Sequence, residues 1–250
     1  MKENNWFDPF YIQSHLNEEE SNIQKNVRDF CNNELKPTVV ERNRKNEFDQ
    51  SLYPKFGSLG VLGQTVKTHG GSGTSNLAYG LVAYEFEKID SSYRSSISVQ
   101  SSLVIHPINE FGSQEQKDKY LPQLIKGEKI GCFGLTESEA GSDPASMKTS
   151  FKKTKDGYIL NGSKNWITNA PIADIFIIWA IEENKDHKSI KGFIIEKNTE
   201  GLNTSTIENK TSLKISPTGQ IILNNVFVPN NLCLENTEGW KSVFSCLNKA

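Results

Sequence analysis

The stretch from Gly131 to Asp143 combines residue types that can bind a flat polar ring. Cys132, Phe133 and Leu135 alternate with glycines, which is typical of a short buried strand, and a polar turn over Gly141 to Asp143 follows. Free backbone N–H groups at the end of a strand can donate to ring heteroatoms, and small residues let a phosphate approach closely. A plain strand followed by an Asp/Ser turn explains the pattern equally well.

A second stretch, Lys164 to Asn169, places Trp166 close to the hydroxyl of Thr168, just after a predicted hairpin. An indole beside a hydroxyl can provide an aromatic wall and a hydrogen-bond donor against one face of a bound ring. The alternative is a tryptophan that covers one end of a β-barrel.

In a third stretch, Arg94 lies among serines, and the pattern predicts that it comes just after the end of a helix. An arginine there can clamp a carboxylate with two parallel hydrogen bonds. Glu87, two helical turns earlier, is spaced to face the same cavity. The alternative is a solvated surface arginine paired with Asp90.

The composition excludes several functional classes. The chain has 250 residues, with 28 basic and 30 acidic side chains and a net charge of −2. That charge is too small and too mixed to favour nucleic acid or an anionic membrane. The N-terminus has no apolar signal segment and no apolar run reaches the length of a membrane span, so we expect a cytoplasmic protein.

The cysteines and histidines do not indicate a metal site. The four cysteines are far apart in the sequence, so we expect neither a disulfide framework nor a zinc site. The histidines have no partner at metal-ligand or triad spacing, and we interpret all of them as structural. They are His15, His69, His106 and His187.

The apolar spacing predicts helices in the first half of the chain and strands after it. Capping signals at Asn17 and Ser75 begin two of the helices, and Asp156-Gly157 is typical of a hairpin turn. Asn224-Asn225 is interpreted as another turn. The predicted helices cover residues 17–35, 52–59, 75–86, 97–111, 114–125 and 239–250, and the predicted strands cover 132–135, 175–181, 192–196 and 220–228.

The order of these elements predicts an α+β fold. We expect an N-terminal all-α helical domain over residues 1–126 and an antiparallel, β-barrel-like middle domain over 127–238. Residues 239–250 then read as the start of a C-terminal helical domain. Their apolar stripe is still open at Ala250, so we expect the rest of that domain to be absent from this chain.

Together these stretches resemble the acyl-CoA dehydrogenase family. GCFGLTESEAGSD is similar to the first flavin-binding signature of the family, with Ser138 where the family usually has proline. KNWITN is similar to the second signature, and the resemblance covers nearly the whole chain. Within the family it is closest to the glutaryl-CoA dehydrogenases, on residues 90–107, 111–137 and 242–250.

The resemblance implies FAD as cofactor and an acyl-CoA substrate. The implied reaction is oxidation between the α and β carbons of glutaryl-CoA and decarboxylation to crotonyl-CoA, as in lysine and tryptophan degradation. Electrons would pass to an electron-transfer flavoprotein, and the full-length family forms homotetramers. The implied FAD-binding residues are Phe133, Gly134, Leu135, Thr136, Ser142, Trp166, Ile167 and Thr168. The implied substrate-binding residues are Glu87, Arg94, Ser95, Ser142, Phe244, Leu247 and Asn248.

The chain departs from the family at the catalytic base. In the family this glutamate lies in the C-terminal helical domain, which also helps to complete the FAD site across a dimer. Glu137 and Glu139 belong to the flavin loop, so no catalytic residue is assigned here. We therefore expect the chain alone neither to retain FAD through purification nor to turn over glutaryl-CoA. Two alternatives stay open: a short-chain acyl-CoA dehydrogenase of other specificity, and a non-catalytic truncated remnant or partner subunit.

Overall fold

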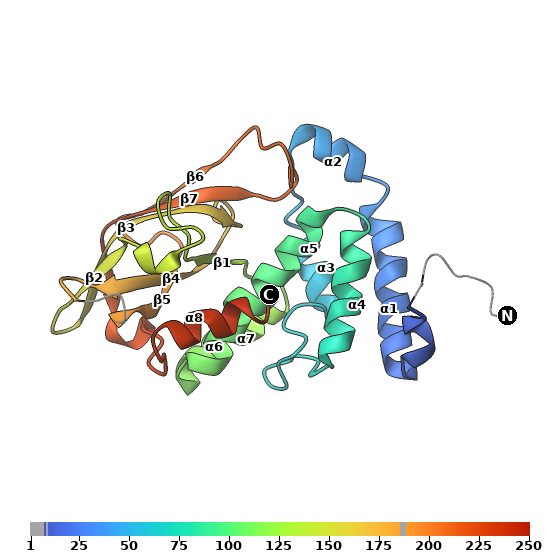
Figure 1. Cartoon of the computed structure of the whole chain (residues 1–250), viewed down its shortest axis with the longest axis horizontal. Coiled ribbons are helices and arrows are strands. Elements are labelled where there is room, and N and C mark those ends of the chain that lie inside the picture. The colour runs from blue at the N-terminus through green and yellow to red at the C-terminus, as the bar shows by residue number, and fades with distance from the viewer. Residues whose placement is uncertain (1–7, 9, 186–188) are drawn as a thin grey trace.

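The computed structural model describes Asp8, residues 10–185 and residues 189–250, so His187 lies outside the described residues. Helices occupy one side of the molecule and a curled sheet the other, with the helix α5 to α6 between them (Figure 1). The predicted fold class, helical first and β-barrel-like second, is confirmed. The boundary at residue 126 stays a prediction, and the structure has α7 ending at Ile125 and β1 beginning at Gly131.

The helical half begins where the capping signals predict. Asn17 and Glu20 form a capping box at the start of α1, and Ser75 accepts from the backbone of Ala78 to cap α4. Every helix that the structure describes is too short or too polar to cross a membrane bilayer. The α-helices of this half are α1 (Glu18–Phe30), α2 (Val39–Lys45), α3 (Leu52–Ser58), α4 (Asn76–Glu87), α5 (Ser91–Ser98), α6 (His106–Phe111) and α7 (Gln114–Ile125).

Two π-helical segments interrupt the α-helices, η2 (Cys31–Leu35) after α1 and η3 (Val99–Ile105) between α5 and α6. The prediction that Arg94 follows a helix end is wrong. The Asp90 side chain accepts from the backbone N–H of Ser92 and begins α5 before Arg94 is reached. Residues 91–111 therefore form one helical run, and Pro107 is accommodated at the junction of η3 and α6.

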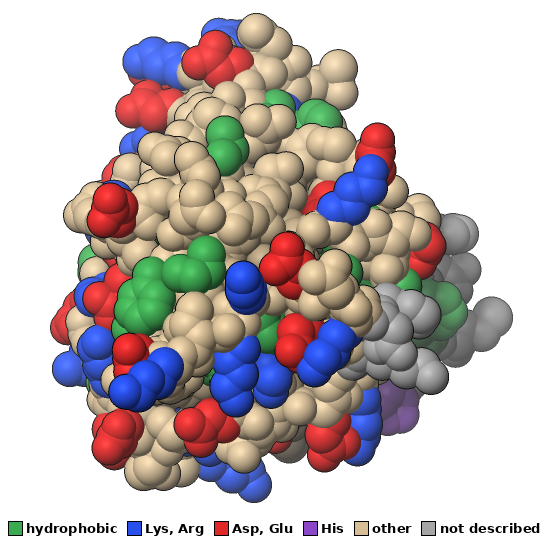
Figure 2. Space-filling model, turned by 90° about the vertical axis from the view of Figure 1, so that its left-hand side faces the viewer, with side chains coloured by type: hydrophobic (Ala, Val, Ile, Leu, Met, Phe, Trp, Pro, Cys, Tyr) green, Lys and Arg blue, Asp and Glu red, His purple; other side chains and the backbone are tan. Residues whose placement is uncertain are grey.

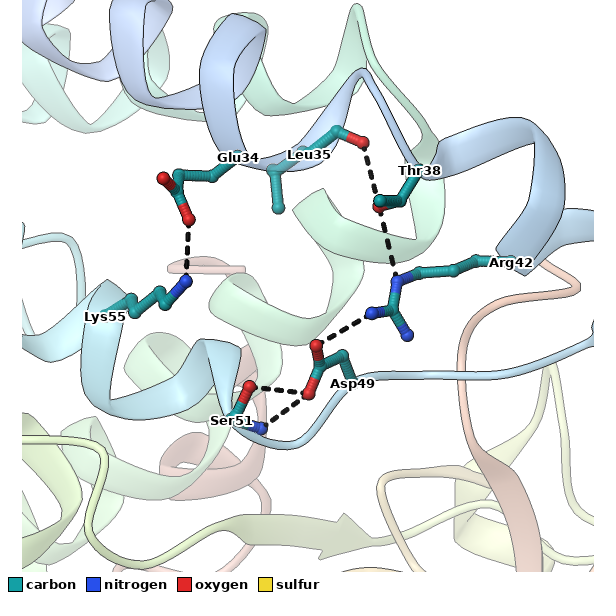
Figure 3. Close-up of polar contacts among 7 residues, drawn as sticks. All are labelled: Glu34, Leu35, Thr38, Arg42, Asp49, Ser51 and Lys55. Carbon is teal, nitrogen blue, oxygen red and sulfur yellow. Dashed lines mark hydrogen bonds and ion pairs between the residues drawn. The ribbon is translucent and has the colours of Figure 1, made fainter.

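Hydrogen bonds and ion pairs between side chains hold the segment that connects α2 to α3 (Figure 3). Arg42 Nη2 lies 2.8 Å from Asp49 Oδ2, and its Nε donates to the Thr38 hydroxyl at 3.3 Å. Hydrogen bonds from Ser51 lower the pKa of Asp49, with Arg42 contributing further. Lys55 pairs with Glu34 at 2.6 Å and joins α3 to the end of the first helix.

The sheet is curled and mixed. Its order is β1-β4-β2-β3-β7-β6, with β5 paired to β4. The pairings of β1 and β2 with β4 are parallel, in contrast to the purely antiparallel sheet expected, and the other pairings are antiparallel. The strands are β1 (Gly131–Gly134), β2 (Ser150–Lys153), β3 (Gly157–Thr168), β4 (Ile175–Glu182), β5 (Lys191–Glu196), β6 (Leu202–Thr206) and β7 (Thr218–Pro229).

The hairpin predicted at Asp156-Gly157 is confirmed, since β2 and β3 pair antiparallel around it. The turn predicted at Asn224-Asn225 is wrong. Both asparagines lie inside β7, where the pairing with β3 shifts register. Asn225 has a φ of 52°, and its N–H donates to the Asn161 side chain at 2.8 Å. These two residues, whose types favour a turn, form a β-bulge instead, because the partner strand β3 continues past them.

Apolar burial is divided between two cores. One joins the helices to the sheet and includes Tyr53, Phe86 and Trp179; the other fills the inside of the curled sheet around Phe151 and Phe193. All four cysteines are buried and unpaired. Basic and acidic described side chains are interspersed on the face at the sheet end of the molecule (Figure 2).

The last helix, α8 (Trp240–Leu247), packs against η3 and α6. Its end is held by the Ser102 hydroxyl, which donates to the carbonyl of Lys249 at 2.7 Å. This contact brings Leu247 close to η3, and so the final predicted helix forms one side of the site described next.

Candidate functional site

A cavity of about 160 Å³ opens where the ends of β1 and β3 meet η3 and α8. Thr136 and Thr168 are the polar residues of its wall, and the rest are apolar. A cavity of this size is smaller than a pocket that encloses a drug-sized ligand, so it can hold one edge or face of a ring. Its lining residues are Val99, Leu103, Phe133, Leu135, Thr136, Trp166, Ile167, Thr168 and Leu247.

The two predicted ring-binding stretches therefore meet in space, and each contributes three residues to the wall. They are joined by a backbone hydrogen bond from the N–H of Asn165 to the carbonyl of Thr136, at 2.9 Å. Gly134 is buried behind the wall and does not line it. A Cβ at this position would lie 2.6 Å from Ile178 Cδ1, so a side chain here would force Ile178 to shift.

Trp166 reaches the cavity because β3 bulges beside it. The pairing of β3 with β7 shifts register between Lys164 and Ile167, and Trp166 has a φ of 59°. The left-handed region is a rare conformation for a bulky aromatic residue. The bulge turns the indole to the rim of the cavity, where 58% of Trp166 is exposed.

Behind the wall lies a buried ion pair that the sequence pattern did not single out. Lys164 Nζ is 2.8 Å from Glu137 Oε1 and also donates to the carbonyl of Leu135 at 3.0 Å. Burial lowers the pKa of Lys164 to about 8, although Glu137 opposes the shift. Burial alone raises the pKa of Glu137, but Lys164 and the backbone N–H of Lys148 lower it overall. No local signal marked the pair, because Lys164 stands between the polar residues Ser163 and Asn165.

The predicted carboxylate clamp lies outside this cavity. Arg94 Nε is 3.0 Å from Glu87 Oε2, so the arginine pairs with Glu87 and not with Asp90, which caps α5. Hydrogen bonds from Ser91 and Arg94 lower the pKa of Glu87. Ser95 is half-buried one helical turn before Val99, so the clamp and the cavity share one helix.

Of the remaining predicted residues, Leu247 belongs to the cavity lining. Phe244 and Asn248 are exposed on the same helix end. Ser142 is exposed on the loop before Pro144 and lies outside the lining. Of the histidines, His69 hydrogen bonds to Asp118 on the surface.

His106 is half-buried at the start of α6. Burial lowers its pKa, although Glu110 opposes the shift. Its ring packs edge-on against Phe111 between α6 and α8, away from the lining of the cavity.

Two protein-family models match this chain, one over the helical half and one over the sheet. The family model described as Acyl-CoA dehydrogenase, N-terminal domain matches residues 17–128, and the one described as Acyl-CoA dehydrogenase, middle domain matches residues 132–226. The chain is 36% identical over 237 residues to an acyl-CoA dehydrogenase of Bacillus subtilis, covering 94% of this chain and 62% of that protein.

It is 37% identical over 216 residues to a short-chain specific acyl-CoA dehydrogenase of Clostridium acetobutylicum, covering 86% of this chain and 57% of that one. A solved glutaryl-CoA dehydrogenase from Mycobacterium smegmatis, in complex with FADH2, superposes with a TM-score of 0.93 at 40% identity. That match covers 96% of this chain and 61% of the solved one. The chain thus spans about three fifths of the length of these relatives.

Proposed function

We propose, from the premise that the chain belongs to the acyl-CoA dehydrogenase family, that it forms the flavin wall and the substrate clamp of a glutaryl-CoA dehydrogenase. The observation that carries this proposal is the cavity lined jointly by Phe133, Leu135 and Thr136 and by residues 166–168. Two separate stretches of the chain meet there and offer threonines within an otherwise apolar wall. That composition fits a flat ring with polar edges.

FAD is the cofactor of this family, and when bound it would accept the hydride that leaves the β carbon of the thioester. Trp166 provides the aromatic face toward the ring, and Phe133, Leu135 and Ile167 exclude water from its apolar side. Thr136 and Thr168 hold the polar edge through hydroxyl and backbone groups. Gly134 leaves room for the side chains packed behind the wall, and we assign Ser142 to the diphosphate and to the substrate.

Arg94 and Ser95 bind the distal carboxylate of the dicarboxylic acyl group in this proposal. Among the described residues, Glu87 is the polar partner of Arg94, and its carboxylate contacts the Nε of the guanidinium. We assign the Nη groups of Arg94 to a bidentate contact with the ligand carboxylate. Glu87 orients the guanidinium, and Phe244, Leu247 and Asn248 line the acyl-CoA path along α8.

The oxidation also needs a base that removes the α proton of the thioester. Among the described residues that line the cavity there is no carboxylate or histidine. The family resemblance assigns this role to a glutamate of the C-terminal helical domain. Transfer of electrons to an electron-transfer flavoprotein and assembly into a homotetramer belong to the same proposal.

A short-chain specificity is the second candidate, because the relatives include a short-chain specific enzyme at 37% identity. The two candidates differ at Arg94. A butyryl tail offers no carboxylate, so an arginine facing the acyl end gains nothing from it, whereas a glutaryl tail replaces the water around the guanidinium with a charge-assisted pair.

The test compares binding of glutaryl-CoA and butyryl-CoA by calorimetric titration in the presence of excess FAD. Arg94→Ala is expected to weaken glutaryl-CoA binding by about tenfold and to leave butyryl-CoA binding within about twofold, since one charged hydrogen-bonded pair contributes about 1.5 kcal/mol or more. Arg44→Ala, which removes an exposed arginine of α2, is the matched control. Equal weakening of both ligands would exclude the clamp and favour short-chain specificity.

A further inference from the structure

The two segments that form the flavin wall are connected beneath it by the ion pair of Lys164 and Glu137. Lys164 is 0% exposed and Glu137 is 9% exposed. The ammonium contacts both the Glu137 carboxylate and the carbonyl of Leu135. The carboxylate in turn accepts from the backbone N–H groups of Lys148 and Thr149, at 2.7 and 3.0 Å. One buried pair thus fixes three separate backbone segments.

The pair adjoins the wall without lining it. Leu135 and Glu137 flank Thr136, and Lys164 precedes the bulge that carries Trp166. A second, weaker set of contacts crosses at the same level, since Asn165 donates from its backbone to Thr136 and from its side chain to the Ser138 hydroxyl, at 2.9 and 3.2 Å. Both wall segments therefore depend on one small polar network for their relative position.

The bulge is a strained element that needs such a support. Trp166 has a left-handed φ of 59°, and the strand returns to its regular pairing only at Ile167. A bulky residue keeps this conformation only where its surroundings determine the backbone. If the strand relaxed to a regular register, successive side chains would exchange faces, and Trp166 would no longer reach the cavity.

We propose that Lys164 and Glu137 are positioning residues, which hold the bulge of β3 against the loop after β1 so that Thr136, Trp166 and Thr168 line one cavity. The inference rests on the proposed function, because those three residues are the proposed flavin wall. A charged pair suits this task better than an apolar contact, since it also satisfies the buried Leu135 carbonyl and two backbone N–H groups.

The test separates positioning from stability by a matched control. Lys164→Met removes the ammonium and keeps the chain length, and Glu137→Gln keeps the shape and removes the charge. Phe193→Leu lowers stability from the core inside the sheet, at a residue that does not line the cavity. Amide hydrogen exchange is measured for residues 131–139 and 163–169, and FAD affinity is measured by fluorescence titration.

Both pair variants are expected to exchange about tenfold faster than Phe193→Leu in these two segments, because local opening no longer needs the pair to break. FAD affinity should fall about tenfold further than in the control, because a displaced wall loses about one hydrogen bond to the ring. If Lys164→Met does not fold, Glu137→Gln alone decides. Exchange and affinity equal to those of Phe193→Leu would overturn the positioning role. Failure of the unchanged chain to bind FAD would instead overturn the proposed function, and exchange would still decide the role of the pair.

Discussion

Two ion pairs of this molecule have the same chemistry and opposite surroundings. Lys164 and Glu137 are 0% and 9% exposed, and every oxygen of the carboxylate is hydrogen bonded within the fold. Arg94 and Glu87 are 39% and 45% exposed on the surface of the helical half. The buried pair cannot exchange its partners for solvent or ligand, so it fixes structure. The exposed pair can, so it is available for recognition.

Loss of the buried lysine is expected to have the largest effect. Lys164→Ala leaves the Glu137 carboxylate without its cation in a buried site, which should lower the free energy of unfolding by about 3–5 kcal/mol. Urea denaturation followed by circular dichroism measures this value. A loss below about 1 kcal/mol would mean that the two pairs do not differ in the way described.

Acid should weaken the buried pair. The pKa of Glu137 in the folded chain lies below its ordinary value of 4.5, so the unfolded state binds more protons as the pH falls from about 4.5. The stabilisation is fully present above that value and is lost as the pH falls through the folded pKa. Urea unfolding measured between pH 6 and pH 3 (about the window of this carboxyl) tests the prediction.

Glu137→Gln should flatten this pH dependence more than Glu87→Gln does. The pKa of Glu87 is also lowered, but its carboxylate is exposed and solvent screens its interactions. If the free energy of unfolding depends on pH in the same way in Glu137→Gln and Glu87→Gln, the buried and exposed pairs do not differ as proposed.

The smallest effect on stability is expected at the exposed pair. Arg94→Ala should change the free energy of unfolding by less than about 0.5 kcal/mol, as exposed pairs usually do. Raising the sodium chloride concentration should weaken the Arg94-dependent part of glutaryl-CoA binding, because salt screens exposed charges. Calorimetric titration at two salt concentrations measures this. A glutaryl-CoA affinity that does not depend on salt would exclude an exposed electrostatic contact.

Features set by neighbouring residues were predicted well from the sequence. The Asn17 capping box and the hairpin at Asp156-Gly157 need only a few adjacent residues, and both are present. The two ring-binding stretches were found for the same reason, since each is a short local pattern. The prediction that they meet in one cavity rested only on the family resemblance, because no local sequence pattern predicts that β1 and β3 end side by side.

Features set by partners distant in the sequence were missed. Lys164 and Glu137 are 27 residues apart, and the pairing of their side chains depends on the packing of β3 against the loop after β1. Asn225 was interpreted as a turn because its type favours a left-handed conformation, whereas the continuing β3 strand makes it a bulge. Strand β6 was missed because its residues are mostly polar and exposed.

The most direct test of the central claim is a fluorescence titration of FAD into the unchanged chain and into two variants. We predict saturable binding, too weak for FAD to be retained through purification. Thr168→Val should weaken it by about tenfold, because a hydrogen bond to the ring edge is lost, and Arg94→Ala should leave it unchanged. Absence of saturable binding, or equal affinity in the unchanged chain and Thr168→Val, would contradict the assignment of this cavity as the flavin wall.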